Sequence, residues 1–203
     1  DEARGGKQSK AAKRRAKKAA EEAERERSIA EYNATRGESA REEEERQLRA
    51  LLQPEGLVLR EIQADGHCMY RSVEDQLSLS SGGDLPEGCD YQSLRRRAAA
   101  ALRAAPEEYL PFVEGCFDAE DGPEAAFERH CKAVEGTAAW GGQLELGVLA
   151  KVLGRPIRVL SVGMPPVVMG EGLGGGPLVV CYQRHAFGLG EHYNSVGSST
   201  GGS

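Results

Sequence analysis

An α+β domain behind a charged helical arm is the fold that this sequence predicts. Three features support it: charged and alanine-rich residues fill the first 50 or so positions, helically spaced apolar residues dominate the middle, and β-branched segments come late. Helices that precede strands, instead of alternating with them, fit an α+β domain better than repeated βαβ units. The 203 residues are therefore expected to divide into an arm (1–52), a globular domain (53–197) and a flexible tail (198–203).

The arm consists mainly of Ala, Glu, Lys, Arg and Gln, which are strong helix formers, and Pro54 supplies a stop. Residues 4–18 contain eight Lys or Arg and no acidic residue, whereas residues 47–203 contain 13 basic and 20 acidic residues. We expect one or two solvated helices that break near Gly37. The arm is either a charged extension without chemistry or a docking element for RNA, a ribosome or an acidic protein.

The predicted elements of the domain follow from hydrophobic periodicity and from Gly and Pro positions. A strand over 57–62 leads into a turn at Asp65 and Gly66. Helices are expected over residues 69–79, 91–105, 107–117, 123–134 and 143–153, and strands over 156–162 and 177–182. A glycine-rich loop spans 170–176, and a final strand carries His192.

Composition excludes several classes of protein. No apolar run approaches 18 residues, so no segment is expected to cross a bilayer. The five cysteines form no CxxC pair, which argues against a disulfide scaffold and a structural zinc site. We expect no metal and no cofactor, and a reducing location in the cytoplasm or the nucleus.

Cys68 is the strongest candidate nucleophile. It follows Asp65, Gly66 and His67 and opens an apolar helix. Unpaired N–H groups and the positive dipole end of a helix favour a thiolate, so we expect a lowered pKa and an ion pair with an imidazole. The backbone N–H groups of residues 66–68 are expected to stabilise the oxyanion of a tetrahedral intermediate.

His192 is the candidate base, and Asn194 is its candidate orienting residue. On a strand, residues two apart face the same side, so the Asn194 oxygen would accept the imidazole N–H. Cys68 is then the nucleophile and His192 the base and later the acid. His185 is the alternative base. Each of these residues alone would more often be structural, and only their combination indicates catalysis.

Three sequence blocks resemble the ovarian-tumour (OTU) family of cysteine deubiquitinases: Asp65–Arg71, Trp140–Leu146 and His192–Val196. The resemblance implies a papain-like fold with a small central sheet flanked by helices. It also implies thiol-dependent hydrolysis at the C-terminal glycine of ubiquitin, with ubiquitin, polyubiquitin chains and ubiquitinated proteins as partners. Asp65, Cys68 and His192 would be the active-site residues, and Gly66 and His67 would form the oxyanion loop.

The narrow Gly-Gly tail of ubiquitin suits a tight channel. Its expected walls are Trp140, Gly141, Gly142, Gly190 and Glu191, and acidic groups of residues 118–121 or Glu135 would contact the preceding arginines. Two alternatives remain open from the sequence: a silent ubiquitin-binding scaffold, and an adaptor that binds RNA or ribosomes through the arm.

Overall fold

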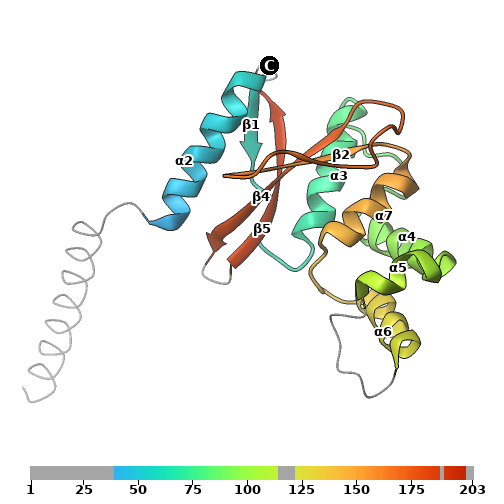
Figure 1. Cartoon of the computed structure of the whole chain (residues 1–203). Coiled ribbons are helices and arrows are strands. Elements are labelled where there is room, and N and C mark those ends of the chain that lie inside the picture. The colour runs from blue at the N-terminus through green and yellow to red at the C-terminus, as the bar shows by residue number, and fades with distance from the viewer. Residues whose placement is uncertain (1–38, 114–121, 188–189, 200–203) are drawn as a thin grey trace, which may run out of the picture. The chain divides into compact units, whose positions relative to one another are not determined.

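The computed structural model describes residues 39–113, 122–187 and 190–199 (Figure 1). Residues 1–38 of the predicted arm, Cys116 and the acidic turn at 118–121 lie outside the described residues. So do residues 188–189 and residues 200–203 of the predicted tail. Within the described part of the chain, no helix is long and apolar enough to cross a membrane.

A mixed five-stranded sheet forms the centre of the domain. Its strand order is β1-β5-β4-β2-β3, with β4 and β2 parallel and the other neighbours antiparallel. The strands are β1 (Leu57–Arg60), β2 (Ile157–Ser161), β3 (Val167–Met169), β4 (Leu178–Phe187) and β5 (Gly190–Ser198). The strand that carries His192 therefore lies between β1 and β4, inside the sheet.

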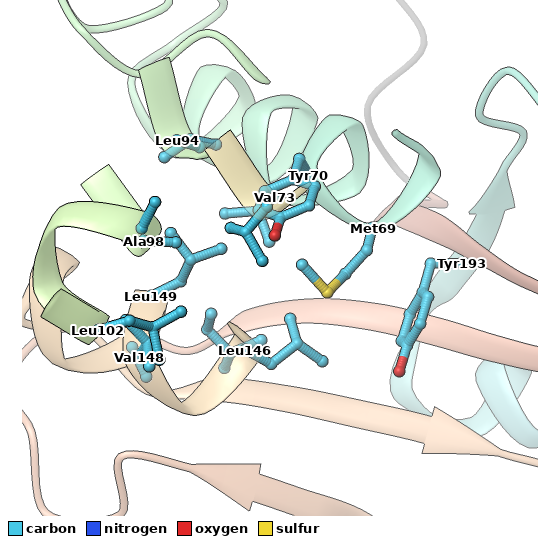
Figure 2. Close-up of a cluster of buried hydrophobic side chains, with 14 of the residues drawn as sticks. Met69, Tyr70, Val73, Leu94, Ala98, Leu102, Leu146, Val148, Leu149 and Tyr193 are labelled. Carbon is cyan, nitrogen blue, oxygen red and sulfur yellow. The ribbon is translucent and has the colours of Figure 1, made fainter. Parts of the chain in front are cut away.

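The main hydrophobic core lies between this sheet and a group of helices on one of its faces (Figure 1). These helices are α3 (Cys68–Ser80), α4 (Tyr91–Ala104), α5 (Pro106–Val113), α6 (Pro123–Gly136) and α7 (Gln143–Leu153). Figure 2 shows Met69 and Tyr70 of α3 beside Leu146 and Leu149 of α7, with Tyr193 of β5 closing the cluster. The core thus joins the start of α3 to the strand that carries His192.

The predicted α+β class and the small central sheet flanked by helices are confirmed. Among the described residues the helix bounds agree closely with the apolar spacing, and α7 begins and ends where the sequence predicts. The last four residues of the helix predicted over 107–117 lie outside the described residues. The sequence missed β3, because a three-residue strand next to Pro165 and Pro166 has too little periodicity to be recognised. It also ended β4 too early, at residue 182 instead of Phe187.

Helix α2 (Ala40–Leu52) belongs to the globular unit. Its buried Leu48 and Leu52 pack against Leu160, Cys181 and Val196 in a second apolar cluster. Because alternate strand residues face opposite sides, Val180 joins the main core while Cys181 joins this second cluster. α2 therefore covers the sheet face opposite α3 and α7.

The compact unit begins at Ala40, so it differs from the predicted division after residue 52. The 3₁₀ turn η1 (Gln53–Glu55) then leads directly from α2 into β1. The predicted start of the tail at residue 198 also differs, since Ser198 ends β5 and the Ser199 N–H donates to the Gly56 carbonyl at 2.8 Å.

If α2 is part of the folded unit, Leu48→Ala will lower the free energy of unfolding by about 2–5 kcal/mol, as expected for a fully buried leucine. The matched control is Leu51→Ala on the same helix, where the side chain is 39% exposed. Urea denaturation of both variants provides the measurement. Equal, small losses would mean that α2 is not docked in solution.

Candidate active site

Cys68 is the first residue of α3, and its side chain is only 8% exposed. Burial raises the pKa of its thiol, and hydrogen bonds from the backbone of Tyr193 and Met69 oppose that shift without reversing it. The Tyr193 hydrogen bond places the sulfur beside β5, the strand that carries His192. The position at the start of the helix was predicted correctly, but the predicted lowering of the thiol pKa was wrong, because desolvation outweighs the backbone donors.

His192 lies on β5 with its side chain buried. Its Nε2 atom is 3.1 Å from the Ile62 carbonyl oxygen and 3.2 Å from Asn194 Oδ1. Both partners are acceptors, so the hydrogen-bond network assigns the proton of the neutral ring to Nε2. Nδ1 then carries the lone pair, which makes it the nitrogen that can accept a proton.

Asn194 is fixed on both sides of its amide. Oδ1 accepts the Ile62 N–H at 2.8 Å, and Nδ2 donates to Gln183 Oε1 at 2.7 Å. The amide therefore presents its oxygen to His192, as the strand alternation predicts. Gln183 and the Ile62 backbone complete this arrangement. Neither could be predicted from the sequence, because an isolated glutamine and a backbone contact have no motif.

The thiol and the imidazole both favour their neutral forms. Burial lowers the pKa of His192, while Asn194, the Ile62 carbonyl and Asp65 offset part of the shift. Together with the raised pKa of Cys68, this lowered pKa disfavours the expected thiolate–imidazolium ion pair. The arrangement fits instead a neutral imidazole that acts as a general base.

Asp65 shapes the loop before Cys68. Its carboxylate accepts the His67 N–H at 2.8 Å and Arg71 Nε at 3.0 Å, and its carbonyl accepts the Cys68 N–H at 3.3 Å. Two of the three N–H groups of residues 66–68 are therefore bonded to Asp65, and the expectation that this loop stabilises an oxyanion stays a prediction. The third belongs to Gly66.

Two glycines in the predicted blocks are required by close packing. A Cβ atom on Gly66 would lie 1.9 Å from the Ala138 carbonyl oxygen, and one on Gly141 would lie 2.4 Å from Met69 Cε. Either side chain would push the loop or the Trp140–Gly142 segment away from the start of α3. These glycines are thus spacers between the loop, α3 and that segment.

Arg95 of α4 is a buried residue that the sequence did not single out. It is 2% exposed and donates to the carbonyls of Val134 at 2.7 Å and Ala139 at 2.9 Å, with longer contacts to Ala133 and Gly66. Burial lowers its pKa. Through these hydrogen bonds a single guanidinium connects the end of α6, the residue before Trp140 and the Cys68 loop.

Glu145 and His130 hold the other end of the Trp140–Gly142 segment. Glu145 accepts the Gly142 N–H at 2.6 Å and contacts His130 Nε2 at 2.8 Å. Burial raises the pKa of Glu145, but the hydrogen bonds from His130 and Gly142 outweigh it, so the net shift is downward. His130 therefore supports the segment beside α3.

A pocket of about 150 Å³ opens at this site. It brings together six residues that the sequence selected, namely Asp65, Gly66, Trp140, Gly190, Glu191 and His192, and it is also lined by Ala64. Gly141 and Gly142 line a different pocket, of about 320 Å³, which shares Glu191 and includes Tyr193.

The remaining predicted residues lie outside both pockets. His67 packs its ring against Tyr91, at 4.9 Å between centroids. His185, the alternative base, has an exposed side chain on β4. Glu135, suggested as an acidic contact, bonds to Arg103 at 2.8 Å.

A family model described as "OTU-like cysteine protease" matches residues 63–193, which include Cys68, His192 and most of the described domain. The chain belongs to this family. Deubiquitinase OTUD6B of Homo sapiens is 40% identical over 188 residues, which cover 93% of this chain and 62% of the human protein. The Gallus gallus protein of the same name is 42% identical, covering 93% and 61%.

OTU domain-containing protein 6A of Mus musculus is 38% identical over 77% of this chain and 51% of its own length. The resemblance to OTU domain-containing protein 6 that the Lys-, Arg- and Ala-rich arm suggests is thus confirmed. The chain spans about three-fifths of the length of the OTUD6B proteins that it matches.

Solved structures agree on the fold. The OTUD1 OTU domain has a TM-score of 0.53 at 18% identity and covers 75% of this chain and 93% of that domain. An OTU deubiquitinase from Wolbachia pipientis wMel has a TM-score of 0.53 at 13% identity, covering 74% and 93%. The predicted OTU fold is confirmed.

The pKa directions predict how Cys68 reacts with iodoacetamide, a neutral reagent that captures thiolates. Because the pKa of Cys68 is raised, its alkylation rate will be low at neutral pH and will climb above pH ~8.5, the range where an ordinary thiol ionises. Peptide mass spectrometry follows residue 68 separately. Cys181 is an internal control, since burial raises its pKa to about 12. A rate that is constant between pH 5 and 8 would indicate an ion pair instead.

Proposed function

We propose that this chain is a deubiquitinase that hydrolyses isopeptide bonds at the C-terminal glycine of ubiquitin. The observation that carries the proposal is His192 Nε2 held by two acceptor oxygens, beside the strand position that contacts the Cys68 thiol. The OTUD6B relatives are named deubiquitinases, and a structural neighbour with a TM-score of 0.50 is an OTU domain in complex with ubiquitin. Both support the same substrate class.

In this proposal Nδ1 of neutral His192 takes the proton of the Cys68 thiol as the sulfur attacks the carbonyl carbon of the ubiquitin C-terminal glycine. The lowered pKa of His192 keeps the ring neutral at pH 7, so it is ready to accept that proton. The C–N bond then breaks, and the imidazolium returns the proton to the leaving lysine amine. A thioester remains on Cys68.

Water completes the reaction. Neutral His192 accepts a proton from the water as its oxygen attacks the thioester, and the ubiquitin carboxylate leaves with the thiol restored. Asn194 acts on the ring rather than on the substrate, because its oxygen stabilises the Nε2–H of both protonation states. Gly66 N–H is the proposed oxyanion donor of the Cys68 loop, and an exchange of the bonds to Asp65 would be needed to recruit His67.

The substrate tail is proposed to lie along the two pockets that share Glu191. Trp140 and Gly190 would form walls of the first, and Gly141 and Gly142 of the second. A substrate tail that ends in two glycines has no side chain at its last two positions, so it would fit the space next to Gly141 and Gly142.

The basic residues 4–18 support a separate proposal, that the arm binds RNA or a ribosomal partner. Such binding would be electrostatic and would weaken as salt rises. A cytoplasmic or nuclear location stays a proposal that is compatible with both roles.

A ubiquitin with a C-terminal electrophile is expected to label the full chain, and Cys68→Ala will abolish labelling. In cleavage assays with a panel of di-ubiquitin linkages, His192→Ala will lower kcat/KM by about 10²–10⁴, the range of general acid–base catalysis. His185→Ala is the matched control and will stay close to the wild type. Asn194→Ala will have an intermediate effect.

Saturable ubiquitin binding by a folded chain that cleaves no linkage and is not labelled would contradict hydrolysis and indicate a scaffold. Labelling that persists in Cys68→Ala would assign the nucleophile to another cysteine. A larger loss in His185→Ala than in His192→Ala would make His185 the base.

A further inference from the structure

Helix α2 lies on the face of the sheet that carries His192 and Asn194. On β5 these two residues face the same side of the sheet as Val196, because the three positions are two residues apart. Val196 packs on Leu48 and Leu52 of α2. A pocket of about 110 Å³ lies between Arg41 and Glu45 of α2 and the His192–Asn194 pair. Figure 1 shows α2 beside β4 and β5, on the opposite side from α3 and α7.

The β4–β5 hairpin has an irregular stretch immediately before His192. Gln183 pairs with His192 and Phe187 pairs with Gly190, so residues 184–186 of β4 lie opposite the single residue 191 of β5. Such a bulge bends the strand, removes ladder partners from its amides and redirects the neighbouring side chains. The direction of His192 therefore depends on how the bulge is held.

Glu44 of α2 holds that bulge. Its side chain is buried, and its two oxygens accept one N–H each, Oε1 from Arg184 and Oε2 from His185, both at 2.8 Å. Backbone amides left without a partner at a partly buried position are costly, so a carboxylate that accepts a hydrogen bond from two of them at once is a specific contact. By contrast, the carboxylate of Glu43 on the same helix bonds to Arg46 and Gln47 within α2.

We propose that Glu44 is a positioning residue for the His192–Asn194 pair, acting through the β4 bulge. The path is short: the bulge begins directly after Gln183, which pairs with His192 in the sheet and accepts a hydrogen bond from Asn194. An effect of Glu44 on turnover rests on the proposed function of His192. An effect of Glu44 on the orientation of the His192 imidazole does not. α2 also lies outside the residues 63–193 that the family model matches, so the family pattern does not account for this contact.

The test is Glu44→Gln in the full chain, with Glu43→Gln as the matched control. The glutamine keeps the size of the side chain but offers a single acceptor and turns an NH₂ group toward the second backbone N–H. Imidazole Cε1–H signals are recorded by NMR for the four histidines of the chain, with His192 assigned from His192→Ala. The His192 signal is expected to move in Glu44→Gln and to stay in place in Glu43→Gln.

Cleavage of di-ubiquitin is measured on the same samples, at a temperature where circular dichroism shows that both variants are folded. We expect kcat to fall about 10- to 100-fold in Glu44→Gln, as for a small misplacement of a catalytic group, with little change in KM. An unchanged His192 signal and an unchanged kcat in folded Glu44→Gln would overturn the proposal. If the wild-type chain cleaves nothing, the proposed function fails, and the NMR comparison still decides whether Glu44 positions His192.

Discussion

The hydrogen bonds to Nε2 of His192 are the interaction on which the proposed chemistry depends. Two acceptors, the Ile62 carbonyl and Asn194 Oδ1, face one ring nitrogen. They fix the tautomer and the plane of the ring, and they leave Nδ1 as the basic nitrogen. Neither group is charged, so the ring stays neutral in its buried surroundings, and the proton transfer that matters takes place only when substrate and thiol meet.

The rest of the domain keeps those few atoms in place. Gln76 of α3 donates to Ser195 Oγ and the Val196 carbonyl and accepts the Val179 N–H, so the helix that begins at Cys68 is tied to β5 and β4. Arg95 fixes the Cys68 loop to the segment before Trp140 from the other side. Buried polar networks of this kind specify a geometry when every member is satisfied. Cys68 and His192, the proposed nucleophile and base, thus belong to one framework, although 124 positions separate them in the chain.

Sequence reasoning succeeded where periodicity or a short motif carries the information. Apolar spacing gave α3 and α7, and strand alternation gave the shared face of His192 and Asn194. It failed where the burial of a side chain determines its pKa or its contacts. The start of a helix suggests an acidic thiol, but the 8% exposure of Cys68 reverses the sign of the shift. Likewise, Glu44 sits in a run of four glutamates, and nothing in that run shows which one is buried against β4.

The central claim, that Nε2 of His192 carries the proton of the neutral ring, is tested most directly by long-range ¹H–¹⁵N correlation spectra of the histidines above the pKa of His192. The account predicts the Nε2–H form for His192, with Nδ1 showing the shift of an unprotonated nitrogen. In Asn194→Ala this preference should weaken. A wild-type spectrum that shows the proton on Nδ1 would contradict the account, because the nitrogen assigned to receive the thiol proton would already be occupied.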